Sequence, residues 1–159
     1  MKKMTTSNAG KKLIKDFEGL RLDAYLCPAG VWTVGYGHVK GVKKGQHITK
    51  AQAEDYLVED IGPAERLLNS LGVNFRQEQF DCLCSFIYNL GVGNFNGSTL
   101  KKKILADAPD HEITDEIVKW VYASGKALTG LKRRRIAEAN MFVGYDMYYL
   151  NEMNNIKKR

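Results

Sequence analysis

Residues 17–38 constrain this chain more than any other segment. They place one carboxylic acid, Glu18, at the end of an apolar helical pattern, and they continue at once into a Gly-rich stretch that carries Cys27, Thr33 and His38. An acid held against apolar neighbours retains its proton nearer to neutral pH than a solvated acid does, and it can then donate that proton. This pattern is more typical of an enzyme than of a binding module.

The local signals around Glu18 predict where one helix ends and a sheet begins. Ser7 or Asn8 can cap a helix that Gly19 ends. Glu18 then lies in the last turn, where the helix dipole disfavours a negative charge. Between residues 22 and 48 the helical period disappears, and aromatic and β-branched residues alternate with glycines. We expect short antiparallel strands joined by tight turns there.

Helical periodicity dominates the rest of the chain. The capping box Thr49-Lys50-Ala51-Gln52 opens one helix, and apolar residues at helical spacing between Phe80 and Ile87 mark a central core helix that Gly91 ends. Further helices are expected over residues 98–105, 110–121 and 132–143. The prediction is one domain over residues 1–159, with a β-rich lobe at about 20–48, a connecting helix at 49–71, and an α lobe formed by 1–19 and 72–159.

Composition restricts the class of protein without identifying a substrate. The net charge of +6 favours polyanions in general and does not separate nucleic acid from bacterial envelope polymers. Three cysteines make a disulfide framework improbable. No apolar run is long enough to span a membrane, and residues 1–10 lack the apolar core of a signal peptide. We therefore expect synthesis in the cytosol without a signal peptide, so that a separate pore or injection system would be needed to reach any extracytoplasmic substrate.

The spacing of the polar residues resembles that of the phage-type lysozymes, the endolysins of glycoside hydrolase family 24. Their pattern is Glu, eight residues, Asp or Cys, five residues, then Thr, and Glu18, Cys27 and Thr33 stand at those offsets. Thr33 also opens Thr-Val-Gly-Tyr-Gly-His, which matches the family's Thr-x-Gly-x-Gly-His. The resemblance continues through residues 88–95, 98–100, 120 and 130–135, and so covers nearly the whole chain.

The resemblance implies an α+β, lysozyme-like fold with an active-site cleft between a small β-rich lobe and a larger α lobe. It implies hydrolysis of the β-1,4 bond between N-acetylmuramic acid and N-acetylglucosamine in peptidoglycan, with bacterial lysis as the result. No metal or organic cofactor, no nucleic acid and no stable membrane insertion are expected, and we expect a monomer. Two rival functions are a catalytically weakened peptidoglycan-binding descendant and a basic protein that disrupts membranes.

Glycoside hydrolysis needs an acid that protonates the departing oxygen and a second group that activates water or attacks the sugar. Glu18 is the predicted acid, and the resemblance makes Thr33 the residue that orients water. Cys27 replaces the commoner Asp, and a thiol with a pKa of about 8.5 is mostly protonated at neutral pH. Cys27 is then an activated base or nucleophile, a minor partner of Thr33, the mark of a weakened enzyme, or a small packed hydrophobe.

His38 has two possible roles. It could form a cysteine hydrolase dyad with Cys27. In the resembling enzymes the corresponding His makes a structural ion pair, and the match of residues 48–50 to the next helix places its partner at Asp60. We favour this pair, with a raised pKa for the His and a depressed pKa for the Asp.

The resemblance also predicts substrate contacts at Val39, Tyr88, Asn89, Gly91 and Ser98, with Tyr88 offering a flat apolar face to a sugar ring. The basic run at residues 132–135 could bind nucleic acid or form a membrane-active amphipathic helix. A solvated helix face is the more common explanation of such a run, and we adopt it here.

Overall fold

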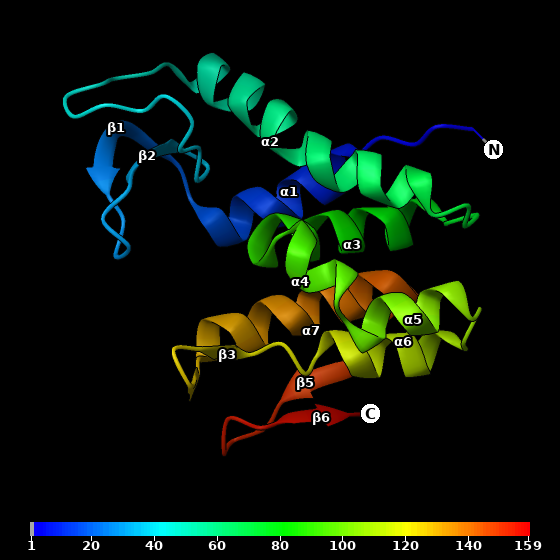
Figure 1. Cartoon of the computed structure of the whole chain (residues 1–159). Helices are drawn as coiled ribbons and strands as arrows, with labels where there is room; N and C mark the ends of the chain where they lie inside the picture. The colour runs from blue at the N-terminus through cyan, green and yellow to red at the C-terminus, as the bar shows by residue number, and fades with distance from the viewer. Residues whose placement is uncertain (1) are drawn as a thin grey trace.

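The computed structural model describes residues 2–159 as a body of packed helices with a β hairpin at one side (Figure 1). Helix α3 (Gln77–Leu90) lies at the centre and packs most extensively against α1 (Asn8–Glu18), α2 (Lys50–Ser70) and α7 (Thr129–Val143). In Figure 1, α2 lies above this centre and α7 lies below it. The combination of a helical body with small antiparallel sheets confirms the α+β class.

Helix α1 has the ends that its sequence predicts. The Ser7 hydroxyl accepts a hydrogen bond from the backbone N–H of Gly10 at 3.3 Å, and Gly19 ends the helix with a φ of 72°. Gly10 also allows α1 to approach α3 closely, because a Cβ at this position would lie 2.7 Å from Cγ of Asp81. Glu18 is therefore the last residue of a helix that is fixed against the central helix.

Helix α3 forms the core of the body, and residues 79–87 are all buried. Cys82 and Cys84 are free thiols within this stretch. Burial raises the pKa of Cys84 to about 12 and also raises the pKa of Cys82. Both thiols are held protonated and out of contact with solvent.

The predicted β region is a hairpin followed by a long return loop. Strands β1 (Arg21–Leu26) and β2 (Trp32–Gly35) pair antiparallel, with Tyr25 opposite Thr33. The chain then returns to β1 through an isolated bridge between Asp23 and His47. This hairpin follows the last turn of α1 directly, so the end of α1 and the start of the sheet share one side of the molecule (Figure 1).

Helix α2 begins at the predicted capping box. The Thr49 hydroxyl accepts from the backbone N–H of Gln52 at 3.1 Å, and the Gln52 side chain accepts from the backbone N–H of Thr49 at 2.8 Å. The helix continues through Pro63 without interruption. It therefore joins the β region to the far end of the helical body as one element.

The chain after α3 contains more short elements than predicted. They are α4 (Val92–Asn96), α5 (Thr99–Leu105), α6 (Asp110–Ile117), and the strand pairs β3 (Tyr122–Ala123) with β4 (Lys126–Ala127) and β5 (Tyr148–Leu150) with β6 (Ile156–Lys158). The helix expected over residues 110–121 ends at Ile117, and α7 begins three residues before the expected residue 132. Ser124 and Gly125 both have positive φ, as a two-residue type I′ hairpin turn requires, and they connect β3 to β4.

His38 ties the loop after β2 to one face of α2. Its Nδ1 lies 2.8 Å from Oδ2 of Asp60, and its ring stacks on Tyr56 at a centroid distance of 3.9 Å. Burial raises the pKa of Asp60 and outweighs the opposing hydrogen bond from His38. The expectation of a depressed Asp60 pKa was therefore wrong, because the loss of solvent around the carboxylate is larger than the gain from its partner.

Replacing Asp60 with Asn should change how stability depends on pH. Because the folded protein holds the Asp60 proton more tightly than the unfolded chain does, this group stabilises the native state below its unfolded pKa. That contribution is lost as the pH rises through the folded pKa. Urea unfolding from about pH 3.5 to 6.5 should show the stability of the parent falling relative to Asp60→Asn, by on the order of 1 kcal/mol or less. The exposed Asp55→Asn on the same helix is the matched control, and a parent that gains stability relative to Asp60→Asn over this range would contradict the assignment.

Candidate active site

Glu18 is held by an arginine that arrives from the far end of the chain. Nη1 of Arg134 on α7 lies 2.5 Å from Oε2 of Glu18, and the two side chains are 5% and 22% exposed respectively. Arg134 also lies over the Phe17 ring, with its guanidinium carbon 5.8 Å from the ring centroid. Glu18 therefore has a cation in direct contact with its carboxylate in addition to the apolar neighbours that the sequence predicts.

The other oxygen of Glu18 faces the turn that follows β2. Gly37 has a φ of 90°, and a Cβ built on it would lie 3.3 Å from Oε1 of Glu18 and 3.8 Å from the hydroxyl of Tyr88. The Tyr88 hydroxyl donates to the carbonyl of Tyr36 at 2.5 Å. Tyr88 thus joins α3 to this turn, and the absence of a side chain at Gly37 leaves room for the Glu18 carboxylate.

Glu18 lines a surface hollow of about 370 Å³. The other residues of the hollow come from the end of α1, the end of α3 and the start of α7: Phe17, Asn89, Leu128, Gly130, Leu131 and Arg134. The side-chain Oδ1 of Asn89 is buried and has no hydrogen-bond partner in the protein. One acid, one cation, one unsatisfied amide oxygen and several apolar surfaces therefore meet in one hollow.

Cys27 and Thr33 lie on the adjacent hairpin, at and beside the turn between β1 and β2. The backbone N–H groups of Val31 and Ala29, with smaller effects from the Thr33 hydroxyl and Gly30, lower the pKa of the Cys27 thiol. Thr33 is 4% exposed, and its hydroxyl donates to the carbonyl of Val31 at 2.9 Å. The hydrogen bonds of this turn therefore favour the thiolate form of Cys27, which a cysteine without such partners adopts only at higher pH.

The remaining predicted substrate contacts differ in their placement. Val39 is 50% exposed beside His38, and Gly91 is exposed at the end of α3. Ser98 is 3% exposed; its hydroxyl accepts from the backbone N–H of Lys101 and donates to the carbonyl of Phe95. The prediction that Ser98 contacts substrate is corrected, because its hydroxyl caps α5 inside the protein.

The basic run at residues 132–135 is not a solvated face. Arg133 is exposed, but Arg134 is 4% exposed and Arg135 is fully buried. Both buried arginines contact Glu138, which follows them by four and three residues on α7. That spacing is the available sequence signal for pairing on one helix, and it was missed. Arg134 is therefore a residue of the site that sequence reasoning did not identify.

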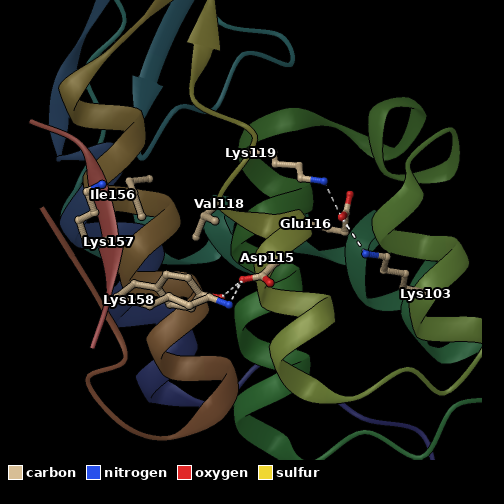
Figure 2. Close-up of a pocket in the computed structure, with 9 residues that line it drawn as sticks. Lys103, Asp115, Glu116, Val118, Lys119, Ile156, Lys157 and Lys158 are labelled. Carbon is tan, nitrogen blue, oxygen red and sulfur yellow. Dashed lines mark hydrogen bonds and ion pairs between the residues drawn. The ribbon is translucent and has the colours of Figure 1, made fainter.

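A larger hollow of about 470 Å³ lies away from Glu18, where α5, α6 and the C-terminal strands meet (Figure 2). Its two carboxylates are already paired with lysines. Glu116 lies 2.9 Å from Nζ of Lys103 and 2.7 Å from Nζ of Lys119, and Asp115 lies 2.6 Å from Nζ of Lys158. Glu18 is also paired, with Arg134, but its hollow contains a residue of the predicted catalytic pattern and is therefore the better candidate for catalysis.

Residues 2–159 contain neither a grouped set of metal ligands nor a membrane-spanning helix. In this part of the chain, no three His, Cys, Asp or Glu side chains are grouped closely enough to hold a metal ion. None of the helices described there combines the length and the apolar character that crossing a bilayer requires.

The chain is similar in sequence to phage lysozymes and endolysins. Residues 15–138 match the family model for phage lysozyme. The chain is 44% identical over 145 residues to an endolysin of Acyrthosiphon pisum secondary endosymbiont phage 1, a match that covers 87% of this chain and 98% of that protein. The chain spans about half the length of two Bacillus phage endolysins that it also matches. Other relatives, at 36–37% identity, are named SAR-endolysins.

Solved structures of similar proteins share the fold. The muramidase domain of SpmX from Asticaccaulis excentricus matches with a TM-score of 0.81 at 33% identity, over 87% of this chain and 97% of that domain. The active form of the P1 phage endolysin Lyz matches with a TM-score of 0.79 at 30% identity, over 87% of this chain and 85% of that one. Its secreted inactive form matches with a TM-score of only 0.59 at 29% identity, over 88% and 96%.

These comparisons confirm the predicted lysozyme-like fold and the predicted class of glycosidase. The chain belongs to the phage lysozyme family.

Proposed function

We propose that this chain is a muramidase endolysin that cleaves the β-1,4 bond between N-acetylmuramic acid and N-acetylglucosamine in peptidoglycan. The observation that carries the proposal is Glu18, which lines an open hollow within the segment that matches the phage lysozyme model. Endolysins act on peptidoglycan, and the chain has an arrangement like that of the active form of one such enzyme.

Glu18 is the proposed general acid. Its carboxyl proton passes to the glycosidic oxygen as the bond to the anomeric carbon breaks, and the positive charge that develops on the sugar is met by the carboxylate left behind. Arg134 fixes the direction of the carboxyl group through the 2.5 Å contact. Gly37 leaves the space in which the carboxyl group lies.

Thr33 and Cys27 are the proposed groups on the opposite side of the scissile bond. The Thr33 hydroxyl donates its proton to the carbonyl of Val31, so its free lone pairs can accept a hydrogen bond from water. The lowered pKa of Cys27 increases the fraction of thiolate, which can take a proton from that water or attack the anomeric carbon itself. This supports an active enzyme over a catalytically weakened descendant.

Asn89 is the strongest of the predicted substrate contacts. It lines the hollow, and a side-chain amide at this position offers both a donor and an acceptor to an acetamido group of the sugar. Phe17 and Leu131 offer apolar surface in the same hollow. Val39, Tyr88 and Gly91 are retained as proposed contacts around it.

Water as the second reactant distinguishes a hydrolase from a lytic transglycosylase, and the pairing of Thr33 with a thiolate favours the hydrolase. The monomeric state and the two-lobed division of the domain remain part of this proposal. Relatives named SAR-endolysins support action outside the inner membrane. We propose that a separate pore or injection system delivers this chain to the periplasm.

Replacing Glu18 with Gln should remove the proton donor and keep the shape of the side chain. Lysis of permeabilised Gram-negative cells, followed as loss of turbidity, should fall by about a hundredfold or more. The matched control is Asp16→Asn, because Asp16 is an exposed acid on the same helix that pairs with Lys12. Killing that survives Glu18→Gln would instead support a membrane-disrupting protein.

Alkylation of the native protein with iodoacetamide should modify Cys27 and inhibit lysis, because Cys82 and Cys84 are buried with raised pKa values. Cys27→Ala should be severely impaired. Cys27→Asp should remain active with an optimum at lower pH, since its carboxylate is ionised throughout, and should be insensitive to iodoacetamide. An alanine variant as fast as the parent would show that Thr33 and its water suffice.

A further inference from the structure

A buried group of charges lies behind Glu18, and the proposed reaction does not touch it directly. It consists of Arg134, Arg135 and Glu138 on α7, with the hydroxyl of Ser85 on α3. We propose that Glu138 is a positioning residue of the active site, which orients Arg134 and sets how tightly Glu18 holds its proton. The mechanistic meaning of this inference rests on the proposed function, in which Glu18 is the acid.

The contacts form a continuous path from Glu138 to Glu18. Oε2 of Glu138 accepts a hydrogen bond from the Ser85 hydroxyl at 2.6 Å and lies 3.5 Å from Nε of Arg134. Nη2 of Arg134 donates to the backbone carbonyl of Ser85 at 3.3 Å, and its Nη1 contacts Glu18. The guanidinium of Arg134 is therefore held along one edge by Glu138 and Ser85, while its Nη1 is directed at the carboxylate in the hollow.

Arg135 completes the group from the opposite side of Glu138. Its Nε lies 2.6 Å from Oε1 of Glu138, as an ion pair without hydrogen-bond alignment, and its Nη2 donates to Oε2 at 3.0 Å. Arg135 and Glu138 are both 0% exposed. Glu138 thus divides one negative charge between a guanidinium group that is fully buried and one, Arg134, that is 4% exposed.

The balance of charges in this group explains why Glu138 can affect the Glu18 carboxyl group. Two guanidinium groups face two carboxylates, and of the four side chains Glu18 is the most exposed, at 22%. Interactions between buried charges are weakly screened. If Glu138 loses its charge, both cations act on Glu18, which should then release its proton at lower pH. If Arg135 loses its charge, Glu138 neutralises Arg134 more fully, and Glu18 should retain its proton to higher pH.

The variants described below leave the other titratable groups near Glu18 unchanged. Tyr88 on α3 lies close to it, with the pair His38 and Asp60 beyond. On α1 itself, Nζ of Lys15 pairs with Glu54 at 2.6 Å, and on α3 the buried thiol of Cys82 lies near Arg135 and Glu138. None of these side chains is altered in the variants below, so a shift can be assigned to the α7 charges.

The test measures the titration of Glu18 directly. The side-chain carboxyl carbons are labelled with ¹³C in all glutamates, and the Glu18 signal is assigned by its absence in Glu18→Gln. The midpoint should move to lower pH in Glu138→Gln and to higher pH in Arg135→Met, by roughly half a pH unit or more in each case. The double variant Arg135→Met/Glu138→Gln should return to near the parent value. Glu112→Gln, on α6 and exposed, is the matched control and should leave the midpoint unchanged.

The double variant also keeps the test valid if a single variant misfolds. Replacing both partners of a buried ion pair destabilises a protein less than removing only one of them. If Glu138→Gln fails to fold, the upward shift in Arg135→Met and its reversal in the double variant decide the question. Midpoints that stay at the parent value in the folded variants would overturn the proposal and leave Glu138 a purely structural residue. Since this readout requires no substrate, such a result is distinct from a Glu18→Gln variant that still lyses cells, which would overturn the proposed function instead.

Discussion

The ion pair between Glu18 and Arg134 is the interaction on which the site depends. The pair joins the last residue of α1 to α7, and Arg134 also donates a hydrogen bond to the backbone carbonyl of Ser85 on the central helix. The acid is therefore held by three packed helices at the point where the chain leaves the helical body for the β hairpin (Figure 1). A carboxyl group on such a rigid support keeps its direction without substrate, which reduces the reorganisation needed for proton transfer.

The two sides of the proposed site gain their properties in different ways. On the helical side, Arg134 contacts the Glu18 carboxylate and is itself held by Glu138 and Ser85. On the hairpin side, backbone N–H groups of one turn lower the pKa of Cys27. A thiol can therefore occupy a position where Asp is commoner. The backbone N–H groups of the turn stabilise the charged form of the thiol, whereas a carboxylate is charged at neutral pH without such help. The exposed position of this turn contrasts with the protonated, buried thiols of α3.

Local signals predicted much of the fold, and long-range electrostatics explain what was missed. The Ser7 and Thr49 caps and the apolar spacing of α3 depend on residues close in sequence, and the structure confirms the elements they predict. Arg134 lies 116 residues from Glu18, so no local pattern could pair them. The raised pKa of Asp60 and the internal bonds of Ser98 likewise depend on burial that only tertiary packing creates.

The central claim is that Glu18, held by this framework, protonates the glycosidic oxygen while Thr33 and Cys27 direct water to the muramyl bond. Mass spectrometry of the fragments that the protein releases from purified peptidoglycan tests it most directly. Hydrolysis predicts fragments that end in a reducing N-acetylmuramic acid, one water heavier than the corresponding anhydro products. Fragments that end in anhydro-muramic acid, or in a reducing N-acetylglucosamine, would contradict the account.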